Sequence, residues 1–439
     1  MKTKTLKRDK VNVITLGCSK NLVDSEVLVA QLQHNDYAAE HAEVADDDAN
    51  IVIVNTCGFI DRAKEESINT ILEYAAIKTQ GGIDKLYVTG CLSERYKQEL
   101  EVEIPEVDAY FGTLEMPSLL ATLNANYQHE LVGERVLMTP QHYAYLKISE
   151  GCNRTCSFCA IPLMRGKHVS RTIDDLVKEA KHLAKNGVRE IMLIAQELTY
   201  YGLDIYKKRC LPDLLNALCE VEGIEWIRLH YAYPNKFPTE IFDVMAAQPK
   251  ICNYLDIPLQ HANNAVLERM HRQITREETT EIVRVAREKV PNIAIRTTFL
   301  VGFPGETEAE YEDLLDFIAE MEFERVGVFQ YSHEENTSAY GFADNVPAEL
   351  KESRAAGVME AQQPISLAKN TAKIGQTMRV LFDRKENGYY VGRTEFDSPE
   401  VDNEVLVKAT KKVYIRLGDF ANVLITKADD YDLHGEVVA

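Results

Sequence analysis

The sequence has little of what marks membrane, fibrous and disulfide-rich proteins. None of its apolar runs reaches the roughly 18 to 20 residues that a membrane span requires. Its 22 glycines and 14 prolines in 439 residues are ordinary numbers, which excludes collagen and low-complexity classes. Nine cysteines are too few for a disulfide scaffold, and their number is odd. We therefore expect a globular cytoplasmic protein in a reducing environment, without a membrane segment.

Positive charge is also scarce. The chain has 49 Lys and Arg residues against 69 Asp and Glu residues, which gives a formal net charge of −20. Proteins contact nucleic-acid phosphates through Lys and Arg, so nucleic acid is not the expected partner. A strongly basic protein is the partner that this charge favours.

The order of sequence patterns predicts an α/β protein with three domains. Residues 9–135 alternate the strands VNVITLG, IVIVNTC and KLYVTGC with helical patterns, which predicts a parallel sheet. Residues 138–368 repeat this alternation six times, which fits a partial (βα)6 barrel better than a closed eightfold one. Residues 371–439 lose the helices and predict a small antiparallel β-barrel, with a hinge before it at Gln362, Gln363 and Pro364.

The strongest chemical motif is a loop of three cysteines directly after a predicted strand. Cys152, Cys156 and Cys159 have the spacing Cys-x3-Cys-x2-Cys. Three thiolates can hold three corners of a four-iron cluster, and without a fourth ligand one iron keeps an open position. The alternative is a structural zinc site, which normally takes four ligands, and no nearby cysteine or histidine pair completes one.

A second set of cysteines has no local spacing but shares a position in the predicted fold. Cys18, Cys57 and Cys91 each end one strand of the N-terminal sheet. Ligands of parallel sheets bind at the carboxyl ends of the strands, so the three thiols would be neighbours at the edge where such folds place a ligand. The alternative is that all three are buried small residues. We expect the three other cysteines to be packing residues: Cys210, Cys219 and Cys252.

The central loop and the pattern around it resemble the radical S-adenosylmethionine superfamily. LGCSKNLVDSE, VNTCGFI and VTGCL resemble the N-terminal domain of the methylthiotransferases, and the last region resembles their TRAM barrel. The resemblance implies two 4Fe-4S clusters, one at each cysteine set. The open iron of the central cluster would bind S-adenosylmethionine. One electron, from a donor such as flavodoxin or ferredoxin, would then cleave it to a 5′-deoxyadenosyl radical.

Two short stretches resemble one branch of the methylthiotransferases. The tRNA-modifying branch typically has GCQMN and TRGRE-like stretches, whereas this chain has Gly17-Cys18-Ser19-Lys20-Asn21 and Met164-Arg165-Gly166-Lys167. These resemble the branch that methylthiolates the β-carbon of an aspartate in ribosomal protein S-twelve of the small subunit. The alternatives are a tRNA (adenosine) methylthiotransferase and a non-catalytic iron–sulfur RNA-binding or sensor protein.

Other candidate residues rest on weaker signals. The 371–439 region has 10 Lys and Arg residues against 12 Asp and Glu residues, a net charge that does not favour RNA binding but leaves a local basic face open. We expect four of its acidic residues to contact the basic substrate: Glu395, Asp397, Glu400 and Asp402. Polar residues on strands of the central region could hold S-adenosylmethionine or could equally be satisfied within the fold: Gln196, Glu197, Gln260, Arg296 and Thr298.

Overall fold

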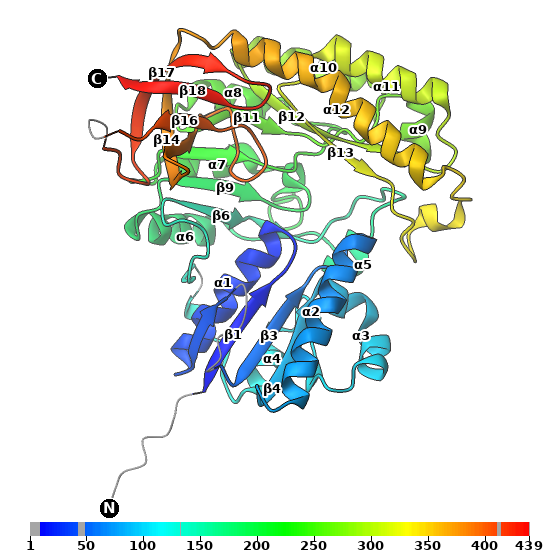
Figure 1. Ribbon diagram of the computed structural model, residues 1–439, viewed down its shortest axis with the longest axis vertical. Coiled ribbons are helices and arrows are strands. Elements are labelled where there is room, and N and C mark those ends of the chain that lie inside the picture. Colours follow the sequence, from blue (N-terminus) through cyan, green and yellow to red (C-terminus); the bar gives the residue numbers. More distant parts are fainter. Residues whose placement is uncertain (1–8, 43–48, 132, 411–413, 439) are drawn as a thin grey trace, which may run out of the picture. The chain divides into compact units, whose positions relative to one another are not determined.

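The computed structural model of the chain describes residues 9–42, 49–131, 133–410 and 414–438 (Figure 1). These residues form two compact units. The first contains Met1–Thr139, Tyr145–Arg154 and Cys159–His182, and the second contains Pro140–Ala144, Thr155–Phe158 and Leu183–Ala439. No helix in the described part of the chain is both long and apolar enough to cross a membrane.

The first unit is built on a five-stranded parallel sheet. Its strands lie in the order β2-β1-β3-β4-β5, and all four neighbouring pairs are parallel. The three predicted strands are confirmed. The sequence patterns missed the two edge strands, which are only four and two residues long. The bounds are β1 (Lys10–Thr15), β2 (Ala38–His41), β3 (Ile51–Thr56), β4 (Lys85–Gly90) and β5 (Ala109–Tyr110).

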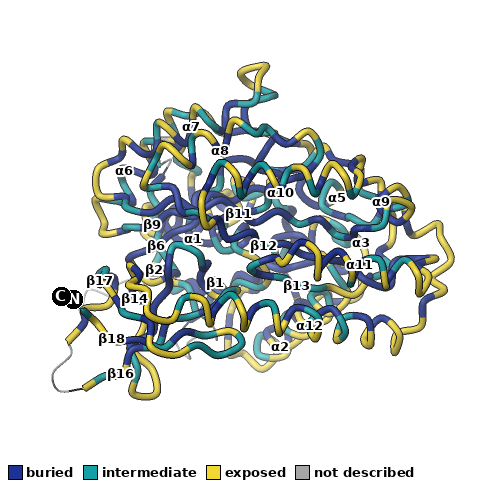
Figure 2. Tube along the Cα trace, turned by 90° about the horizontal axis from the view of Figure 1, so that it is seen from above, coloured by how far each residue is buried: buried dark blue, intermediate teal, exposed yellow. Residues whose placement is uncertain are grey.

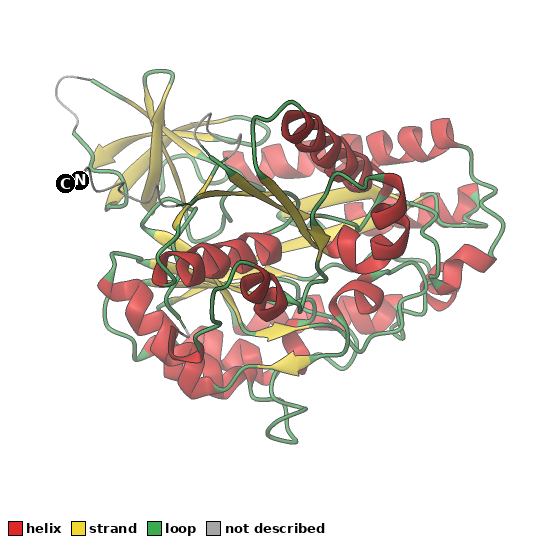
Figure 3. Ribbon diagram, turned by 90° about the horizontal axis from the view of Figure 1, so that it is seen from below, coloured by secondary structure: helices red, strands yellow, loops and turns green. Residues whose placement is uncertain are grey.

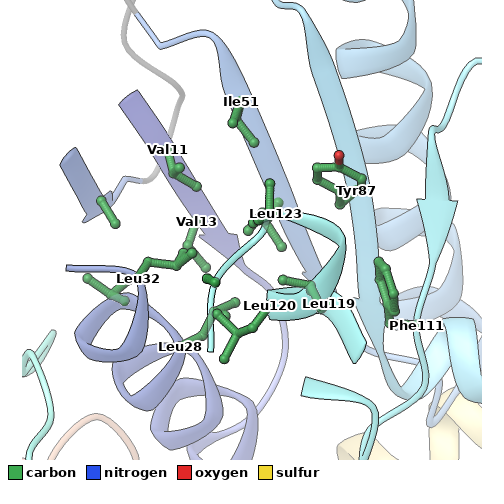
Figure 4. Close-up of a cluster of buried hydrophobic side chains, with 14 residues drawn as sticks. Val11, Val13, Leu28, Leu32, Ile51, Tyr87, Phe111, Leu119, Leu120 and Leu123 are labelled. Carbon is green, nitrogen blue, oxygen red and sulfur yellow. The ribbon is translucent and has the colours of Figure 1, made fainter. Parts of the chain in front are cut away.

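Helices cover both faces of this sheet, which explains why β3 is buried at every position. Ile51 and Ile53 pack on one face with helices α1 (Ser19–His34) and α4 (Met116–Thr122), as Figure 4 shows in part. Val52 and Val54 pack on the other face with α2 (Asp61–Thr79) and α3 (Cys91–Glu103). Because the strands run in one direction, the carboxyl ends of β1, β3 and β4 meet at one edge.

A short segment completes the first unit and flanks the central cysteine loop. Strand β7 pairs antiparallel with β8, and Glu150 on β7 lies opposite Val169 on β8. Helix α5 lies between these two strands in the sequence and begins at Ile161, shortly after Cys159. The bounds are β7 (Ser149–Glu150), α5 (Ile161–Arg165), β8 (Val169–Ser170) and α6 (Ile173–Lys185).

The six predicted strands of the central region form one open sheet, and five of them lie entirely in the second unit. Their order is β13-β12-β11-β10-β9-β6, and the four pairs from β9 to β13 are parallel. Strands β9 and β10 are buried at every position. Figure 2 draws buried residues in dark blue. The bounds are β6 (Tyr143–Lys147), β9 (Glu190–Ile194), β10 (Trp226–Leu229), β11 (Ile251–Asp256), β12 (Ala294–Val301) and β13 (Arg325–Gln330).

Helices connect these strands, as the alternating pattern predicted (Figure 3). Thr275 and Thr307 cap α10 and α11 with complete capping boxes, in which each threonine accepts a hydrogen bond from the backbone of the third helical residue. The helices of this part are α7 (Leu211–Cys219), α8 (Glu240–Ala247), α9 (Asn264–Arg269), α10 (Arg276–Lys289), α11 (Glu308–Met321) and α12 (Ala348–Thr371). Short 3-10 helices lie at His129–Leu131, Leu198–Tyr200 and Ser338–Gly341.

The predicted hinge before the barrel is wrong. Gln362, Gln363 and Pro364 lie inside α12, which continues without interruption from Ala348 to Thr371. Proline removes one backbone hydrogen bond from a helix but does not end it when tertiary contacts hold the segment. Here the buried side chain of Gln362 donates a hydrogen bond of 2.8 Å to the backbone oxygen of Phe323.

The last region is a closed five-stranded barrel, as predicted, although one of its pairs is parallel. The strand order is β14-β15-β16-β18-β17, with β17 paired back to β14, and only β16 and β18 run in parallel. Alternate residues such as Val380 and Phe382 fill the interior. The bounds are β14 (Thr377–Glu386), β15 (Tyr389–Arg393), β16 (Val405–Lys408), β17 (Phe420–Ala428) and β18 (Leu433–Val438).

Candidate functional site

Three cysteines of the first unit lie at the same edge of its sheet. Cys18 follows β1 and forms the N-cap of α1, Cys57 follows β3 directly, and Cys91 follows β4 as the first residue of α3. Strands β1, β3 and β4 are neighbours in the sheet. The topology therefore brings the predicted N-terminal triad together, although the three residues are far apart in the sequence.

Two glycines allow the loops of this triad to approach each other. A Cβ atom on Gly17 would lie 2.9 Å from the Sγ of Cys57, and one on Gly58 would lie 2.7 Å from the Cα of Leu92. Neither distance leaves room for a side chain. Any larger residue at these two positions would push the cysteine-bearing loops apart, so the backbone is shaped around the thiols.

The three thiols differ in their exposure and in their electrostatic environment. Cys18 is exposed, whereas Cys57 and Cys91 are buried. Burial raises the pKa of the Cys57 thiol, and it raises the pKa of the Cys91 thiol to about 12. The charge of Arg165 opposes both shifts. Thiolates are the form that binds metals, so this site needs positive charge to hold three of them.

A small cavity lies near the same edge of the sheet. Its volume is about 20 Å³, and Asn55 at the end of β3 and Thr89 and Gly90 at the end of β4 line it. Asp24 on α1 and Thr113 contribute further polar groups. Open parallel sheets bind their ligands at this edge, and the N-terminal triad lies at that position.

The first half of the central cysteine loop is held within the first unit. The backbone N–H of Cys152 donates to the oxygen of Gly166 at 3.1 Å, and the N–H of Arg154 donates to the Sγ of Cys152 at 3.4 Å. The side-chain oxygen of Asn153 accepts a hydrogen bond from the N–H of His168 at 3.1 Å. A backbone N–H that points at the sulfur is a recurrent stabiliser of iron–sulfur ligands.

Cys156 lies in the second unit, where two side chains contact its sulfur. The guanidinium of Arg272 donates a hydrogen bond to Sγ at 3.3 Å, and the hydroxyl of Tyr233 lies 3.5 Å from it. Arg272 also stacks over the ring of Tyr233, with 4.2 Å between the guanidinium carbon and the ring centroid. Phe158 packs on a buried cluster that includes Met270. No sequence pattern marked Arg272 or Tyr233, because each is distant from the loop in the sequence.

Among the described residues, no three His, Cys, Asp or Glu side chains converge on a point where one metal ion could bind. A single zinc ion requires such convergence, because all its ligands bind one atom. The thiolates of a four-iron cluster bind different irons and can lie farther apart. Thiolates are the donor type that iron–sulfur clusters take, so the chemistry of the two triads suits such a group.

The five residues predicted to bind S-adenosylmethionine lie in the second unit but in different positions. Gln196 and Glu197 follow the carboxyl end of β9, and Glu197 accepts hydrogen bonds from the backbone and hydroxyl of Thr199. Gln260 follows β11 and pairs with Phe299 on β12. Arg296 lies near the start of β12 and forms ion pairs with Asp256 and Asp402.

Thr298 lies in the middle of β12 and is buried, and its hydroxyl lies 3.4 Å from the guanidinium of Arg296. The predicted packing role of the remaining cysteines is confirmed, since all three are buried: Cys210, Cys219 and Cys252.

Two of the four barrel residues predicted to contact a basic substrate are buried inside the second unit, so that expectation is wrong for them. The carboxylate of Asp397 forms an ion pair with Arg325. The side chain of Asp402 is 1% exposed and pairs with Arg296 at 3.3 Å. Glu395 is partly buried and accepts a hydrogen bond from the backbone of Asn253, and only Glu400 is exposed. Composition counts acidic residues but does not separate exposed ones from buried, paired ones.

Three known families match successive stretches of the chain. The uncharacterized protein family UPF0004 matches residues 10–112, the Radical SAM superfamily matches residues 146–318, and the TRAM domain matches residues 374–438. The first stretch contains the N-terminal triad, the second contains the central triad, and the third covers the closed barrel.

Relatives match the chain along its whole length. A protein of Flavobacterium psychrophilum, named ribosomal protein uS12 methylthiotransferase RimO, is 60% identical over 436 residues, which cover 99% of this chain and 100% of that protein. The protein of the same name from Bacteroides thetaiotaomicron is 50% identical and covers 99% of each chain. The name uS12 denotes the S-twelve protein of the small ribosomal subunit.

Solved structures share the fold at low sequence identity. The radical S-adenosylmethionine methyltransferase TsrM from Kitasatospora setae, solved with cobalamin and a 4Fe-4S cluster bound, is 15% identical with a TM-score of 0.53, and the match covers 88% of this chain and 81% of TsrM. The cobalamin-dependent S-adenosylmethionine radical enzyme OxsB is 14% identical with a TM-score of 0.51, and the match covers 82% and 56%.

Proposed function

This chain belongs to the RimO family of ribosomal protein uS12 methylthiotransferases, and we propose that it transfers a methylthio group to the β-carbon of an aspartate in uS12. The observation that carries the proposal is 60% identity over the whole chain to a protein of that name. A β-carbon C–H bond of aspartate has no acidity that a general base could use at neutral pH, so the reaction requires a radical route. Two separate cysteine triads in one chain suit such a route.

The six cysteines would hold two 4Fe-4S clusters. Cys18, Cys57 and Cys91 would bind one cluster at the edge of the first sheet, where β1, β3 and β4 end side by side. Cys152, Cys156 and Cys159 would bind the other and leave one position open for S-adenosylmethionine. When bound, the clusters and S-adenosylmethionine would supply the radical and the methylthio group, and the protein would bind and orient them.

The protein's own groups around the central triad would stabilise the thiolate form of its ligands. Arg272 and Tyr233 lie within hydrogen-bond range of the Cys156 sulfur, and the backbone of Arg154 donates to the Cys152 sulfur. Hydrogen bonds to cluster sulfurs raise the reduction potential, because they stabilise the additional negative charge of the reduced state. These groups would therefore help the central cluster to accept the electron from a donor such as flavodoxin or ferredoxin.

S-adenosylmethionine would bind near the carboxyl ends of the strands in the second unit. We propose Gln196, Glu197 and Gln260 as its first candidates, because they follow the ends of β9 and β11. Arg296 and Thr298 remain candidates of lower rank, since Arg296 is already paired with two carboxylates within the fold.

The three regions of the chain would have different roles. Residues 9–135 would carry the second cluster, residues 138–368 the radical chemistry, and residues 371–439 the contact with the substrate. The net charge of −20 favours a cationic protein substrate over tRNA, and the full-length relatives do not favour the tRNA (adenosine) alternative. Because uS12 is made and assembled in the cytoplasm, we place the enzyme there.

Mass spectrometry of uS12 and of tRNA from cells that lack this gene tests the proposal. The uS12 protein should lose the mass of one methylthio group, and the modified nucleosides of tRNA should stay unchanged. Expression of the unaltered gene should restore the mass, whereas a gene with Cys152, Cys156 and Cys159 changed to alanine should not. Loss of a tRNA methylthio group with intact uS12 would contradict the proposal.

A further inference from the structure

A buried arginine from the segment after the central cysteine loop reaches the N-terminal cysteine site within the first unit. Arg165 is the last residue of α5, and its side chain is only 4% exposed. One guanidinium nitrogen forms ion pairs with Asp24 at 2.6 Å and with Glu150 at 3.2 Å. Glu150 lies just before the central cysteine loop, so these contacts anchor Arg165 to the strand that leads into it.

The other guanidinium nitrogen binds the residue that joins two loops of the N-terminal triad. It donates a hydrogen bond to the side-chain oxygen of Asn21. The amide nitrogen of Asn21 in turn donates to the backbone oxygens of Leu16 at 2.8 Å and Thr56 at 3.0 Å, near Cys18 and next to Cys57. The side-chain oxygen of Asn21 also lies 3.8 Å from the Sγ of Cys91. Asn21 is fully buried and contacts the surroundings of all three cysteines.

Arg165 also places its positive charge near the Cys91 sulfur. The oxygen of Asn21 that accepts a hydrogen bond from its guanidinium is the same atom that lies 3.8 Å from the Sγ of Cys91. Its ion pairs with Asp24 and Glu150 hold the charged guanidinium in this buried position. A guanidinium stays charged under all working conditions, which makes it a permanent counter-charge.

We propose that Arg165 is the positioning residue of the N-terminal cysteine site. It holds Asn21, whose side chain joins the loops that carry Cys18 and Cys57. It also supplies a positive charge that favours the reduced state of the group bound there. The charge part rests on the proposed function, because it requires a cluster at this triad. An added electron increases the negative charge of a cluster, so a nearby buried cation raises its reduction potential.

The charge part is tested on protein with Cys152, Cys156 and Cys159 changed to alanine, which leaves one cluster to titrate. Arg165→Met should lower the midpoint potential by about 59 mV or more, a tenfold change in the ratio of reduced to oxidised cluster for a one-electron couple. Arg165→Lys keeps the charge and should give a smaller shift. Arg135→Lys is the matched control, because Arg135 is an equally buried arginine of this unit that pairs with Glu26 and Glu179.

The positioning part is tested on the iron-free protein, so its outcome does not depend on a cluster. Lysine cannot bind Asn21 and the two carboxylates at once, because it lacks the planar fork of arginine. Iodoacetamide should therefore alkylate Cys57 and Cys91 several-fold faster in Arg165→Lys than in the unaltered protein, while Arg135→Lys should leave the rates unchanged.

Unchanged alkylation rates in Arg165→Lys would overturn the positioning role, and an unchanged midpoint potential in Arg165→Met would overturn the counter-charge role. Absence of any iron at the N-terminal triad of the unaltered chain would instead overturn the proposed function. Faster alkylation in Arg165→Lys would support the positioning role in that case too.

Discussion

The hydroxyl of Tyr254 on β11 donates a hydrogen bond of 2.7 Å to the carboxylate of Asp402 in the barrel region. The same carboxylate accepts from the backbone of Ser398 and pairs with Arg296 on β12. Strands of the central sheet thus hold the barrel through buried polar contacts. In a buried setting each of these groups needs its partner, because an unpaired one would lose its hydration without compensation.

Tyr254→Phe should destabilise the second unit measurably. The change removes one hydrogen bond to a buried carboxylate, so we expect the free energy of unfolding to fall by about 1–3 kcal/mol. Asp402→Ala should cost more, about 3–5 kcal/mol, because it leaves Arg296 with one carboxylate fewer. Chemical denaturation followed by circular dichroism measures both. Tyr414→Phe is the control, since Tyr414 is 87% exposed and its change should have almost no effect.

Binding to uS12 should depend on the exposed acidic residues of the barrel and not on the buried ones. Changing Glu386, Glu400 and Glu436 to lysine should weaken binding, more strongly at low salt than at high salt, because exposed charges are screened by ions. Titration of the enzyme with uS12 at two salt concentrations measures the effect. Cleavage of S-adenosylmethionine should stay unchanged, since none of the three residues is a candidate ligand.

A matched charge reversal elsewhere separates a local contact from the effect of net charge. Glu99, Glu101 and Glu103 are exposed on α3 in the first unit, and changing them to lysine alters the net charge by the same amount. This variant should bind uS12 more tightly than the barrel variant does. Equal weakening in the two variants would argue against a barrel contact, and tight binding of tRNA without affinity for uS12 would favour the tRNA alternative.

Iron content should report the two cysteine triads separately. Anaerobic reconstitution should give about eight irons per chain, and about four when either triad is changed to alanine, because each cluster contains four irons. Loss of the central triad should abolish formation of 5′-deoxyadenosine, whereas loss of the N-terminal triad should stop methylthio transfer but leave that cleavage measurable. Cys219→Ala should keep about eight irons, since Cys219 is a buried packing residue on α7.

About four irons in the unaltered protein would mean that Cys18, Cys57 and Cys91 only pack. Persistence of methylthio transfer without these three residues would exclude a second cluster from the reaction.

The cysteine positions could be predicted because strand patterns repeat locally. VNVITLG, IVIVNTC and KLYVTGC each show an apolar run that ends at or next to a cysteine, and parallel strands bring such ends to one edge. The contact between Arg165 and Asn21 spans 144 positions, and a polar pair at that separation leaves no periodic signal. The prediction that Asp397 and Asp402 contact a basic substrate was wrong for a related reason. Asp397 and Asp402 owe their environment to Arg325 and Arg296, which lie on strands of another region.

Stability of the second unit should fall with acid through His261. Burial lowers the pKa of this imidazole to about 4, whereas an unfolded chain gives it the ordinary value of 6.5. The unfolded state therefore binds a proton that the folded state does not, between these two values. The contribution of His261 to the free energy of unfolding is complete above pH 6.5 and declines as the pH falls toward 4. The decline is about 1.4 kcal/mol per pH unit, or about 3 kcal/mol over this range.

His261→Asn isolates this effect, because asparagine does not titrate and its side-chain oxygen can replace the Nδ1 that accepts from the backbone of Asn263 at 3.0 Å. Carboxyl groups that do not contact His261 also titrate in acid, and they affect both proteins alike. The difference in unfolding free energy between variant and unaltered protein should therefore shift in favour of the variant as the pH falls from 7 to about 4. Denaturant titrations at several pH values measure it. A difference that stays constant over this range would show that the imidazole has the same pKa in the folded and the unfolded protein, as it would if the carboxylate of Glu306, 3.7 Å away, offset the effect of burial.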